Sequence, residues 1–238
     1  MGAALVPRDY VAIADAYALE AVADTEGLKF CVWMRHAASR YLRDRQRAAG
    51  KNAPFRFDAR QAERHSRFIE NLPHVEGRWE TKNIVLHASH VFIVVNIFGF
   101  RNLDGTRRFT SALFNVARKN AKSTLSAAIV LSCLCLEEEP GPQAISAATT
   151  GSQARIVFNI AKRMAELTPA LREKYALEVF ANSIVGHSAG GSFKPINAKA
   201  STQDGLNPCY VSLDEIHAHK THDLLNVLQS AAASHTSS

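Results

Sequence analysis

The sequence predicts an α/β protein with a largely parallel sheet flanked by helices and preceded by a helical N-terminal segment. Apolar residues in the first third recur at helical spacing, and after that short apolar runs of strand length alternate with longer helical patterns. Strands that alternate with helices are typical of parallel α/β folds. The composition, 47% hydrophobic and 21% charged over 238 residues, suits a globular chain with a substantial core.

Three helices are predicted in the N-terminal third. Apolar positions at helical spacing cover residues 8–25 and 28–47, and a Gly- and Pro-containing loop separates them from a third helix over 58–71. Asp58 stands where the N-cap of that third helix belongs. We therefore expect a helical, basic segment over residues 1–75, followed by the α/β core over 76–238.

The core is predicted from short apolar runs without helical period, which are typical of buried strands, and from longer amphipathic patterns. The expected strands cover 112–116, 143–148 and 210–213, with a hairpin of 178–185 and 192–196 around residues 187–191. The expected helices cover 123–136, 152–167 and 222–233.

Composition excludes several classes of protein. No apolar run reaches the roughly 18–20 residues that a membrane span needs, and the N-terminus has no signal-peptide pattern. The spacing of Cys31, Cys133, Cys135 and Cys209 matches no zinc motif, so we expect buried thiols in a reducing compartment. These features predict an intracellular protein with no membrane partner.

Positive charge is concentrated in one part of the chain. The net charge is +6, and residues 35–67 hold ten basic side chains against three acidic ones, a local charge of +7. Such a segment suits binding to a phosphate backbone. A solvated helical face, or a surface that docks on an acidic protein, would give the same composition.

The first motif with chemical meaning covers residues 116–124, Val-Ala-Arg-Lys-Asn-Ala-Lys-Ser-Thr, between a predicted strand and a predicted helix. Backbone amides at a helix N-terminus bind anions, so this is where a phosphate-binding loop belongs. Lys122 would reach the β- and γ-phosphates and the Ser123 hydroxyl would take a Mg²⁺ position. The match is imperfect, because Val116 and Ala121 occupy the glycine positions of G-x-x-x-x-G-K-[ST], and Lys-Ser-Thr also opens helices by chance.

The second motif is a predicted buried strand that ends in two carboxylates, Asp214 and Glu215. Asp214 would hold Mg²⁺ through water and Glu215 would polarise the attacking water, two roles that phosphoryl transfer requires. Alone, the pair also fits a solvent-facing turn. The pair follows Lys122 by about ninety residues, with strand–helix units between them. Together the two motifs favour a P-loop-type ATPase that uses ATP and Mg²⁺. His217 and His219, two apart and followed by Lys220, do not suit a zinc site.

Several stretches resemble the N-terminal ATPase domain of tailed-phage terminase large subunits. They are FNVARKNAKSTLSAAIVL, ISAATTGSQARIVFNIAKRM, AKASTQDGLNPCYVSLDEIHAHK and the upstream FIENLPHVEGRW. The resemblance covers about residues 15–230, and the run from Asp204 to Lys220 is its most specific part. It implies a RecA-like (ASCE-type) P-loop NTPase sheet, with a further strand between the two motif strands.

The resemblance also implies an activity and partners. Such a domain hydrolyses ATP to drive double-stranded DNA into a procapsid, as a homo-oligomeric ring on the capsid portal, together with the terminase small subunit, in the host cytoplasm. The coupling motif and the acidic residues of the nuclease domain would lie beyond Ser238. Nuclease activity is therefore not expected in this chain.

Residue roles follow from the same resemblance, position by position. The catalytic residues would be Glu215, Lys122 and the loop arginine Arg118. The nucleotide would be held by Arg118, Lys119, Asn120, Ala121, Lys122, Ser123 and Thr124, and Mg²⁺ by Ser123 and Asp214.

This chain departs from the family pattern at three places. Ala117 and Ala121 replace the loop's usual proline and glycine, and Ala88-Ser89-His90 replaces a Pro-Trp-Gln whose glutamine reads adenine. Some relatives place a trans-acting arginine just before the position of Gly205, where this chain has Asp204. Lys199 and Arg155 are candidates for that role, and the sequence does not choose between them.

Two other functions remain open from the sequence. Asp-Glu-Ile-His also suits a DExH helicase-like ATPase, which would need a second RecA-like domain. The substitutions at Ala121 and His90 also suit a degenerate DNA-binding or assembly module with little ATP turnover. Nucleotide titration together with a phosphate-release assay separates these readings.

Overall fold

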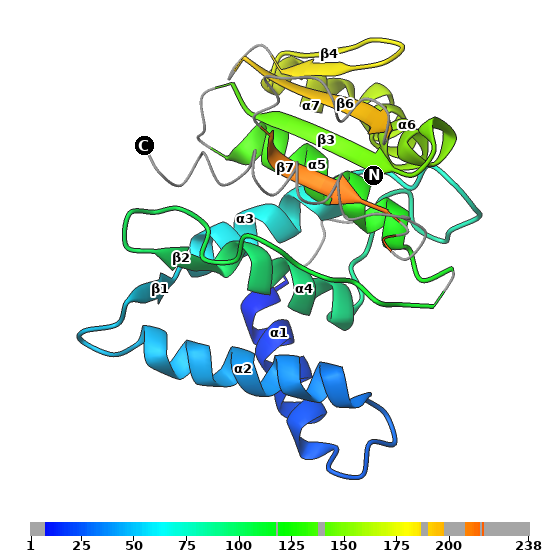
Figure 1. Ribbon diagram of the computed structural model, residues 1–238. Helices are drawn as coiled ribbons and strands as arrows, with labels where there is room; N and C mark the ends of the chain where they lie inside the picture. The colour runs from blue at the N-terminus through cyan, green and yellow to red at the C-terminus, as the bar shows by residue number, and fades with distance from the viewer. Residues whose placement is uncertain are drawn as a thin grey trace. The chain divides into compact units, whose positions relative to one another are not determined.

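The computed structural model describes residues 8–117, 119–137, 141–186, 190–197, 208–214 and 216. The chain divides into two compact units: the first is Met1–Asn71 with Val85–Asn115, and the second is Leu72–Ile84 with Val116–Ser238 (Figure 1). The boundary that the sequence predicted between the basic helical segment, residues 1–75, and the ATPase core, residues 76–238, stays a prediction. No helix among these described residues is long and apolar enough to cross a membrane.

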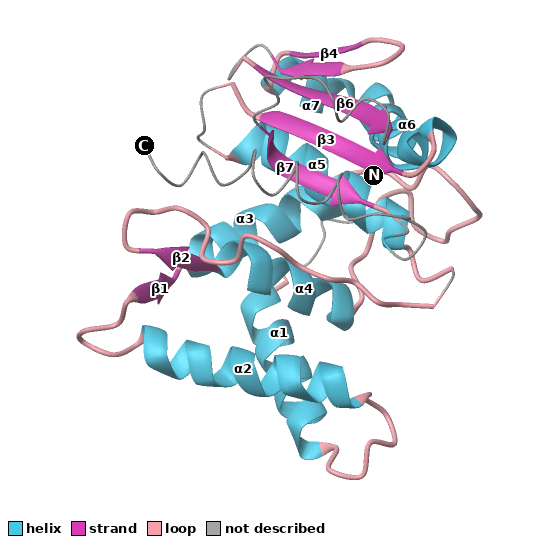
Figure 2. Ribbon diagram, viewed as in Figure 1, coloured by secondary structure: helices cyan, strands magenta, loops and turns pink. Residues whose placement is uncertain are grey.

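The first unit is mainly helical. It contains α1 (Tyr10–Ala23), α2 (Val32–Ala48), α3 (Ala59–Glu70) and α4 (Ala88–Gly99), with a small antiparallel pair of β1 (Phe55–Phe57) and β2 (Phe100–Asn102) (Figure 2). The three predicted N-terminal helices are confirmed. The N-cap of α3 is also confirmed, because an Asp58 carboxylate oxygen accepts a hydrogen bond from Gln61 N at 3.1 Å.

An aromatic cluster forms the core of this unit. Tyr41 on α2 is fully buried and meets the rings of Phe92 and Phe100 edge-on, with centroids 5.3 and 5.8 Å away. Its hydroxyl donates to Asp15 Oδ1 on α1 at 2.5 Å. Burial, reinforced by this hydrogen bond, raises the pKa of Tyr41 well above its ordinary value. The same side chain therefore joins α1, α2 and α4.

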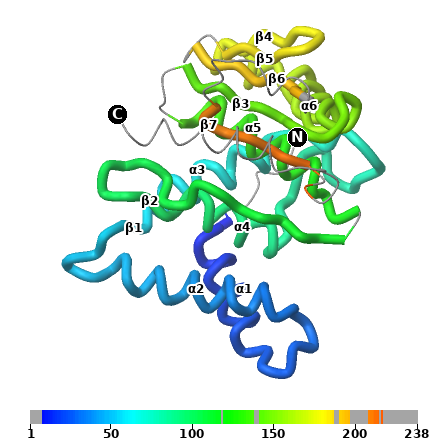
Figure 3. Tube along the Cα trace, in the orientation of Figure 1, coloured from blue at the N-terminus to red at the C-terminus, as the bar shows by residue number. Residues whose placement is uncertain are grey.

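The second unit is built on a five-stranded mixed sheet in the order β4-β5-β6-β3-β7. The strands are β3 (Gln143–Ala148), β4 (Leu177–Val179), β5 (Ile184–Gly186), β6 (Gly191–Asn197) and β7 (Pro208–Leu213). β3 runs parallel to both β6 and β7, whereas β4, β5 and β6 pair antiparallel. Two strands far apart in the sequence, β3 and β7, thus lie side by side (Figure 3).

Helices α5 (Lys122–Leu136) and α6 (Gly151–Glu166) pack together on one face of this sheet, and the short α7 (Pro169–Lys174) follows them. Ser146 on β3 faces this helical side, since its hydroxyl donates to Ala154 O on α6 at 2.8 Å. Ile145 and Ala147 face the other side, with Leu213 of β7 packed against them. Side chains alternate along a strand, so the position after Leu213 returns to the helical side.

Most predicted core elements are confirmed, including the strand over 143–148, the helices over 123–136 and 152–167, and the hairpin of β5 with β6. The predicted strand over 112–116 is wrong. These residues pair with no described strand, and their side chains lie mostly in solvent, with Leu113 78% exposed. A strand needs a partner, and a short apolar run does not reveal whether it has one.

Two further expectations are revised. The predicted strand over 178–185 is two strands, β4 and β5, because the chain reverses between them where Phe180 N donates to Ser183 O at 2.8 Å. Of the four free thiols, Cys133 is buried as expected but Cys31 is exposed. Burial raises the pKa of the Cys135 thiol to about 12. The predicted helix over 222–233 lies outside the described residues.

Candidate active site

The segment before α5 folds into a tight loop. Lys119 and Ala121 both have left-handed backbone conformations, with φ of 67° and 54°. Between them, the Asn120 side chain donates from Nδ2 to Ala117 O at 3.0 Å and closes the turn. Left-handed residues in a turn direct successive N–H groups toward one side, and such concave arrangements bind anions.

The start of α5 continues this arrangement. Ala121 is the N-cap residue and has no side chain that can accept a hydrogen bond from the first turn. The intrahelical bonds begin with Leu125 N, which donates to Ala121 O at 2.8 Å. The backbone amides of Lys122, Ser123 and Thr124 therefore lie at the positive end of a 15-residue helix, where a phosphate is stabilised.

The two sequence motifs meet in the second unit. Lys122 Nζ lies 2.7 Å from Asp214 Oδ1, and the two side chains are 32% and 14% exposed. Asp214 is held at the carboxyl end of β7 because its backbone N–H donates to Ala147 O on β3 at 3.0 Å. Ligands of α/β proteins bind at the carboxyl edge of the parallel strands, so the pair stands where such a site is expected.

The oxygen atoms at this edge suit Mg²⁺. The ion prefers oxygen ligands, and proteins hold it through one or two side chains plus substrate phosphates and water. Asp214 supplies a carboxylate, and Ser123 follows Lys122 in the first turn of α5 with a hydroxyl. The described part of the chain holds no cluster of three or more His, Cys, Asp or Glu side chains that would form an all-protein metal cage. Arg118, Glu215, His217 and His219 lie outside it.

Comparison with known proteins decides the family. The model of the family described as "Terminase large subunit, ATPase domain" matches residues 88–235, more than half of the chain. The chain belongs to this terminase ATPase family.

Individual relatives agree with this assignment. The terminase large subunit of Enterobacteria phage HK97 is 35% identical over 105 residues, which are 44% of this chain and 21% of that protein. The crystal structure of the HK97 bacteriophage large terminase superposes with a TM-score of 0.63 and 28% identity, over 74% of this chain and 36% of that one. The chain thus spans about a third or less of the length of these relatives. The family, rather than the helicase-like alternative, accounts for both motifs.

The second unit of this terminase domain also contains a polar cluster that the sequence reasoning missed. Thr149 and Thr150 follow the carboxyl end of β3, and the hydroxyl of each lies within 3.1 Å of Gln153 Oε1 on α6. The spacing Thr150-x-x-Gln153 directly after a buried strand was the available signal.

The structure does not decide the remaining predicted roles. His90, which stands at the position of the family's adenine-reading glutamine, lies in α4 of the first unit, and its role stays open. Arg155 Nη1 donates to Asn182 Oδ1 at 2.9 Å, and Lys199 lies outside the described residues. The choice between these two trans-acting candidates stays open.

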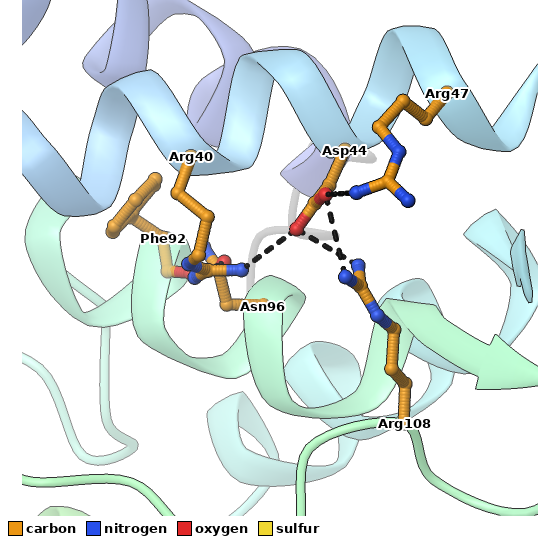
Figure 4. A network of polar contacts seen from close by, with 6 residues as sticks. All are labelled: Arg40, Asp44, Arg47, Phe92, Asn96 and Arg108. Atoms are coloured by element: carbon orange, nitrogen blue, oxygen red, sulfur yellow. Dashed lines mark hydrogen bonds and ion pairs between the residues drawn. The ribbon is translucent and has the colours of Figure 1, made fainter.

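Several arginines of the basic segment, residues 35–67, form ion pairs inside the first unit of this terminase domain. Asp44, almost fully buried, forms ion pairs with Arg40, Arg47 and Arg108 at 3.3, 3.5 and 2.8 Å (Figure 4). Arg40 also donates to Asn96 Oδ1 at 2.8 Å. Desolvation lowers the pKa of Arg40, with Asp44 opposing that effect. These arginines therefore hold the unit together.

Only part of residues 35–67 therefore remains a candidate for DNA binding. Arg45 is also engaged, since it pairs with Asp15 at 3.0 Å. Arg60, Arg64 and Arg67 follow one face of α3 at i, i+4 and i+7, and all three are exposed. Within the described chain, Arg60 and Arg64 have no ion-pair partner, and Arg67 meets Glu63 at 3.6 Å. This arginine face of α3 is the part of the segment best placed to bind phosphates.

Proposed function

We propose that this chain is an ATP-hydrolysing motor domain that drives double-stranded DNA into a procapsid. The observation that carries the proposal is the 2.7 Å contact between Lys122 and Asp214, which joins a loop with anion-binding geometry to a carboxylate at the edge of the sheet. The two residues are about ninety positions apart. Family membership supports the same assignment.

Nucleotide binding begins with an exchange of partners at Lys122. The phosphates approach the amides of the loop and of the first α5 turn, and Lys122 transfers from Asp214 to the β- and γ-phosphates. Asp214 and the Ser123 hydroxyl would be the side chains that hold Mg²⁺, with Asp214 acting through water. When bound, Mg²⁺ supplies neutralisation of phosphate charge.

The residues around this pair complete the proposed mechanism. Glu215, next to Asp214 in the sequence, accepts the proton of the attacking water, and Arg118 of the loop stabilises charge on the phosphates. Both assignments rest on the family resemblance, because neither residue belongs to the described part of the chain.

Translocation needs DNA and other proteins. We assign the DNA contact to the arginine face of α3, whose exposed guanidinium groups can neutralise backbone phosphates of any sequence. The chain matches only 21% of the HK97 large subunit. A homo-oligomeric ring on the capsid portal, the terminase small subunit as partner and action in the host cytoplasm therefore belong to this proposal.

Lys122→Ala tests the nucleotide site. The lysine faces the proposed ligand and not the core, so the variant should fold but bind ATP at least about a hundredfold more weakly, the effect of losing a charge-assisted phosphate contact. Lys162→Ala is the matched control, because Lys162 is a half-exposed lysine of α6 whose carboxylate partner, Glu166, is 3.9 Å away. Calorimetry with a non-hydrolysable ATP analogue measures both. Undiminished affinity of Lys122→Ala would remove this loop from the proposal.

A further inference from the structure

A polar cluster lies beside the Lys122–Asp214 pair and has no role in the mechanism above. It sits where β3 passes into α6. Thr149 Oγ1 lies 2.8 Å from Gln153 Oε1 and Thr150 Oγ1 lies 3.1 Å from the same atom, and Gln153 N donates to Thr150 Oγ1 at 3.3 Å. Thr149 and Gln153 are both half-buried.

Strand register places this cluster next to Asp214. β3 and β7 are parallel with Ala147 opposite Leu213, and Asp214 N continues the ladder to Ala147 O. Asp214 therefore stands one strand spacing from Ala148, and the Thr149 Cα is ~6 Å from the Asp214 Cα by the usual spacing and rise. Asp214 and α6 also share the same face of the sheet, so the polar groups converge at one corner of the second unit.

The hydrogen bonds fix the direction of the Gln153 amide. Two hydroxyls converge on its oxygen, which leaves the amide nitrogen on the opposite side, and in the described chain that nitrogen has no acceptor. A capping role would explain part of this arrangement, because Thr150 is the N-cap of α6 and Gln153 stands at the position of a capping box. Capping does not explain Thr149, which precedes the cap and holds the amide as well.

We propose that Gln153, oriented by Thr149, is a catalytic residue that holds the attacking water of ATP hydrolysis beside Asp214. The amide N–H can donate a hydrogen bond to this water and hold it in place without taking its proton, and orienting glutamines also position the attacking water in other phosphoryl-transfer sites. This inference rests on the proposed ATPase function and adds a third element to it, after the loop and the acidic pair.

The reaction step is ordinary hydrolysis. The water oxygen forms a bond to the γ-phosphorus as the bond from that phosphorus to the β–γ bridging oxygen breaks. ADP leaves with the electron pair of the broken bond, and the water's proton passes to the Glu215 carboxylate. Gln153 holds the water in line with the bond that breaks, and the Thr149 hydroxyl holds the Gln153 amide in its orientation.

Three variants separate water orientation from helix capping. Gln153→Glu keeps a capping-box residue but removes the amide N–H groups. Thr149→Val keeps the shape of Thr149 and removes its hydroxyl. Ser152→Ala removes an exposed hydroxyl of the same turn, whose hydrogen-bond partner among the described residues is Thr150. Each is compared with the wild type for phosphate release, for affinity toward ADP·BeF₃⁻, and for affinity toward ADP·AlF₄⁻, which includes the position of the attacking water.

We expect Gln153→Glu to lower kcat about 100-fold and Thr149→Val about tenfold, the range for losing a group that acts only in the transition state. ADP·AlF₄⁻ affinity should fall with kcat, while ADP·BeF₃⁻ affinity changes less than about threefold, and Ser152→Ala should behave as wild type. An equal loss of affinity for both analogues, or an unchanged kcat in Gln153→Glu, overturns the inference.

The wild-type control distinguishes failure of this inference from failure of the proposed function. If the wild type hydrolyses ATP and depends on Lys122, an unaffected Gln153→Glu overturns the water-orienting role alone. If the wild type binds nucleotide without turnover, the test is the ratio of its affinities for ADP·AlF₄⁻ and ADP·BeF₃⁻: a ratio that Gln153→Glu leaves unchanged overturns the water-orienting role. If it binds neither analogue, both proposals fall.

Discussion

Ala121 is the loop residue whose substitution has the most informative expected effect. The structure places it at φ 54° and ψ 22°, a left-handed conformation that costs an L-residue about 1–2 kcal/mol relative to glycine. It stands directly before Lys122, where the backbone must wrap closest to the phosphates. Ala121→Gly removes this strain and the Cβ atom together.

The size of the effect follows from that strain. A penalty of about 1–2 kcal/mol lowers the equilibrium constant for the closed loop by about five- to thirtyfold, and apparent affinity falls by up to the same factor. We therefore predict that the wild type binds ATP weakly and that Ala121→Gly binds about tenfold more tightly. The gain in folding stability should be smaller, because glycine adds about 0.5–1 kcal/mol of unfolded-state freedom.

The chain offers a matched control for this experiment. Ala176 also has a left-handed backbone, φ 48°, and follows α7, an element separate from the loop. Ala176→Gly should therefore change the melting temperature about as much as Ala121→Gly but leave affinity unaltered. Calorimetric titration of all three proteins with a non-hydrolysable ATP analogue measures the difference. Equal affinity of wild type and Ala121→Gly would refute the reasoning and remove the main reason to suspect a degenerate motor.

Two further predictions concern the first unit. Asp44→Asn should lower the free energy of unfolding by about 3 kcal/mol in urea titrations, because Arg40 and Arg108 lose a buried counter-charge but remain partly in water. The control is Glu20→Gln, which breaks an exposed ion pair with Lys29 and should lower the free energy of unfolding by under about 1 kcal/mol. A similar cost for both variants would mean that Asp44 does not organise the unit. Affinity for duplex DNA should fall steeply with salt, and replacing Arg60 and Arg64 by alanine should lower the log–log slope by about 2, at about 0.9 per phosphate contact. Arg172→Ala on α7 is the control, and an unchanged slope in the double variant would move the DNA contact elsewhere.

The sequence predicted those features that are set by nearby residues. Asp58 starts α3 because a carboxylate at the N-cap bonds an amide three residues on, and that signal is entirely local. The strand over 143–148 and the helix after Lys122 were likewise predicted with bounds close to those observed. The sequence also predicted that the Lys122 and Asp214 motifs serve one site, but the direct contact between the two side chains is an observation of the structure.

Features that depend on distant partners were not predicted. Residues 112–116 have the composition of a strand, but pairing decides whether a strand forms, and no local pattern reports it. The basic segment looked like one exposed stripe, yet Asp15 and Asp44 engage Arg45 and Arg40 inside the first unit. The sequence also left the sign of φ at Ala121 open, and the structure gives it as positive.

Glu215 provides the most direct test of the central claim that this terminase domain hydrolyses ATP at the carboxyl edge of its sheet. Glu215→Gln keeps the shape of the side chain but cannot take a proton from water. The measurement is phosphate release from Mg-ATP in the presence of duplex DNA, with calorimetric binding on the same preparations. The account predicts wild-type turnover, and a variant that binds Mg-ATP as tightly but turns it over at least about 1,000-fold more slowly. Undiminished phosphate release by Glu215→Gln would contradict it.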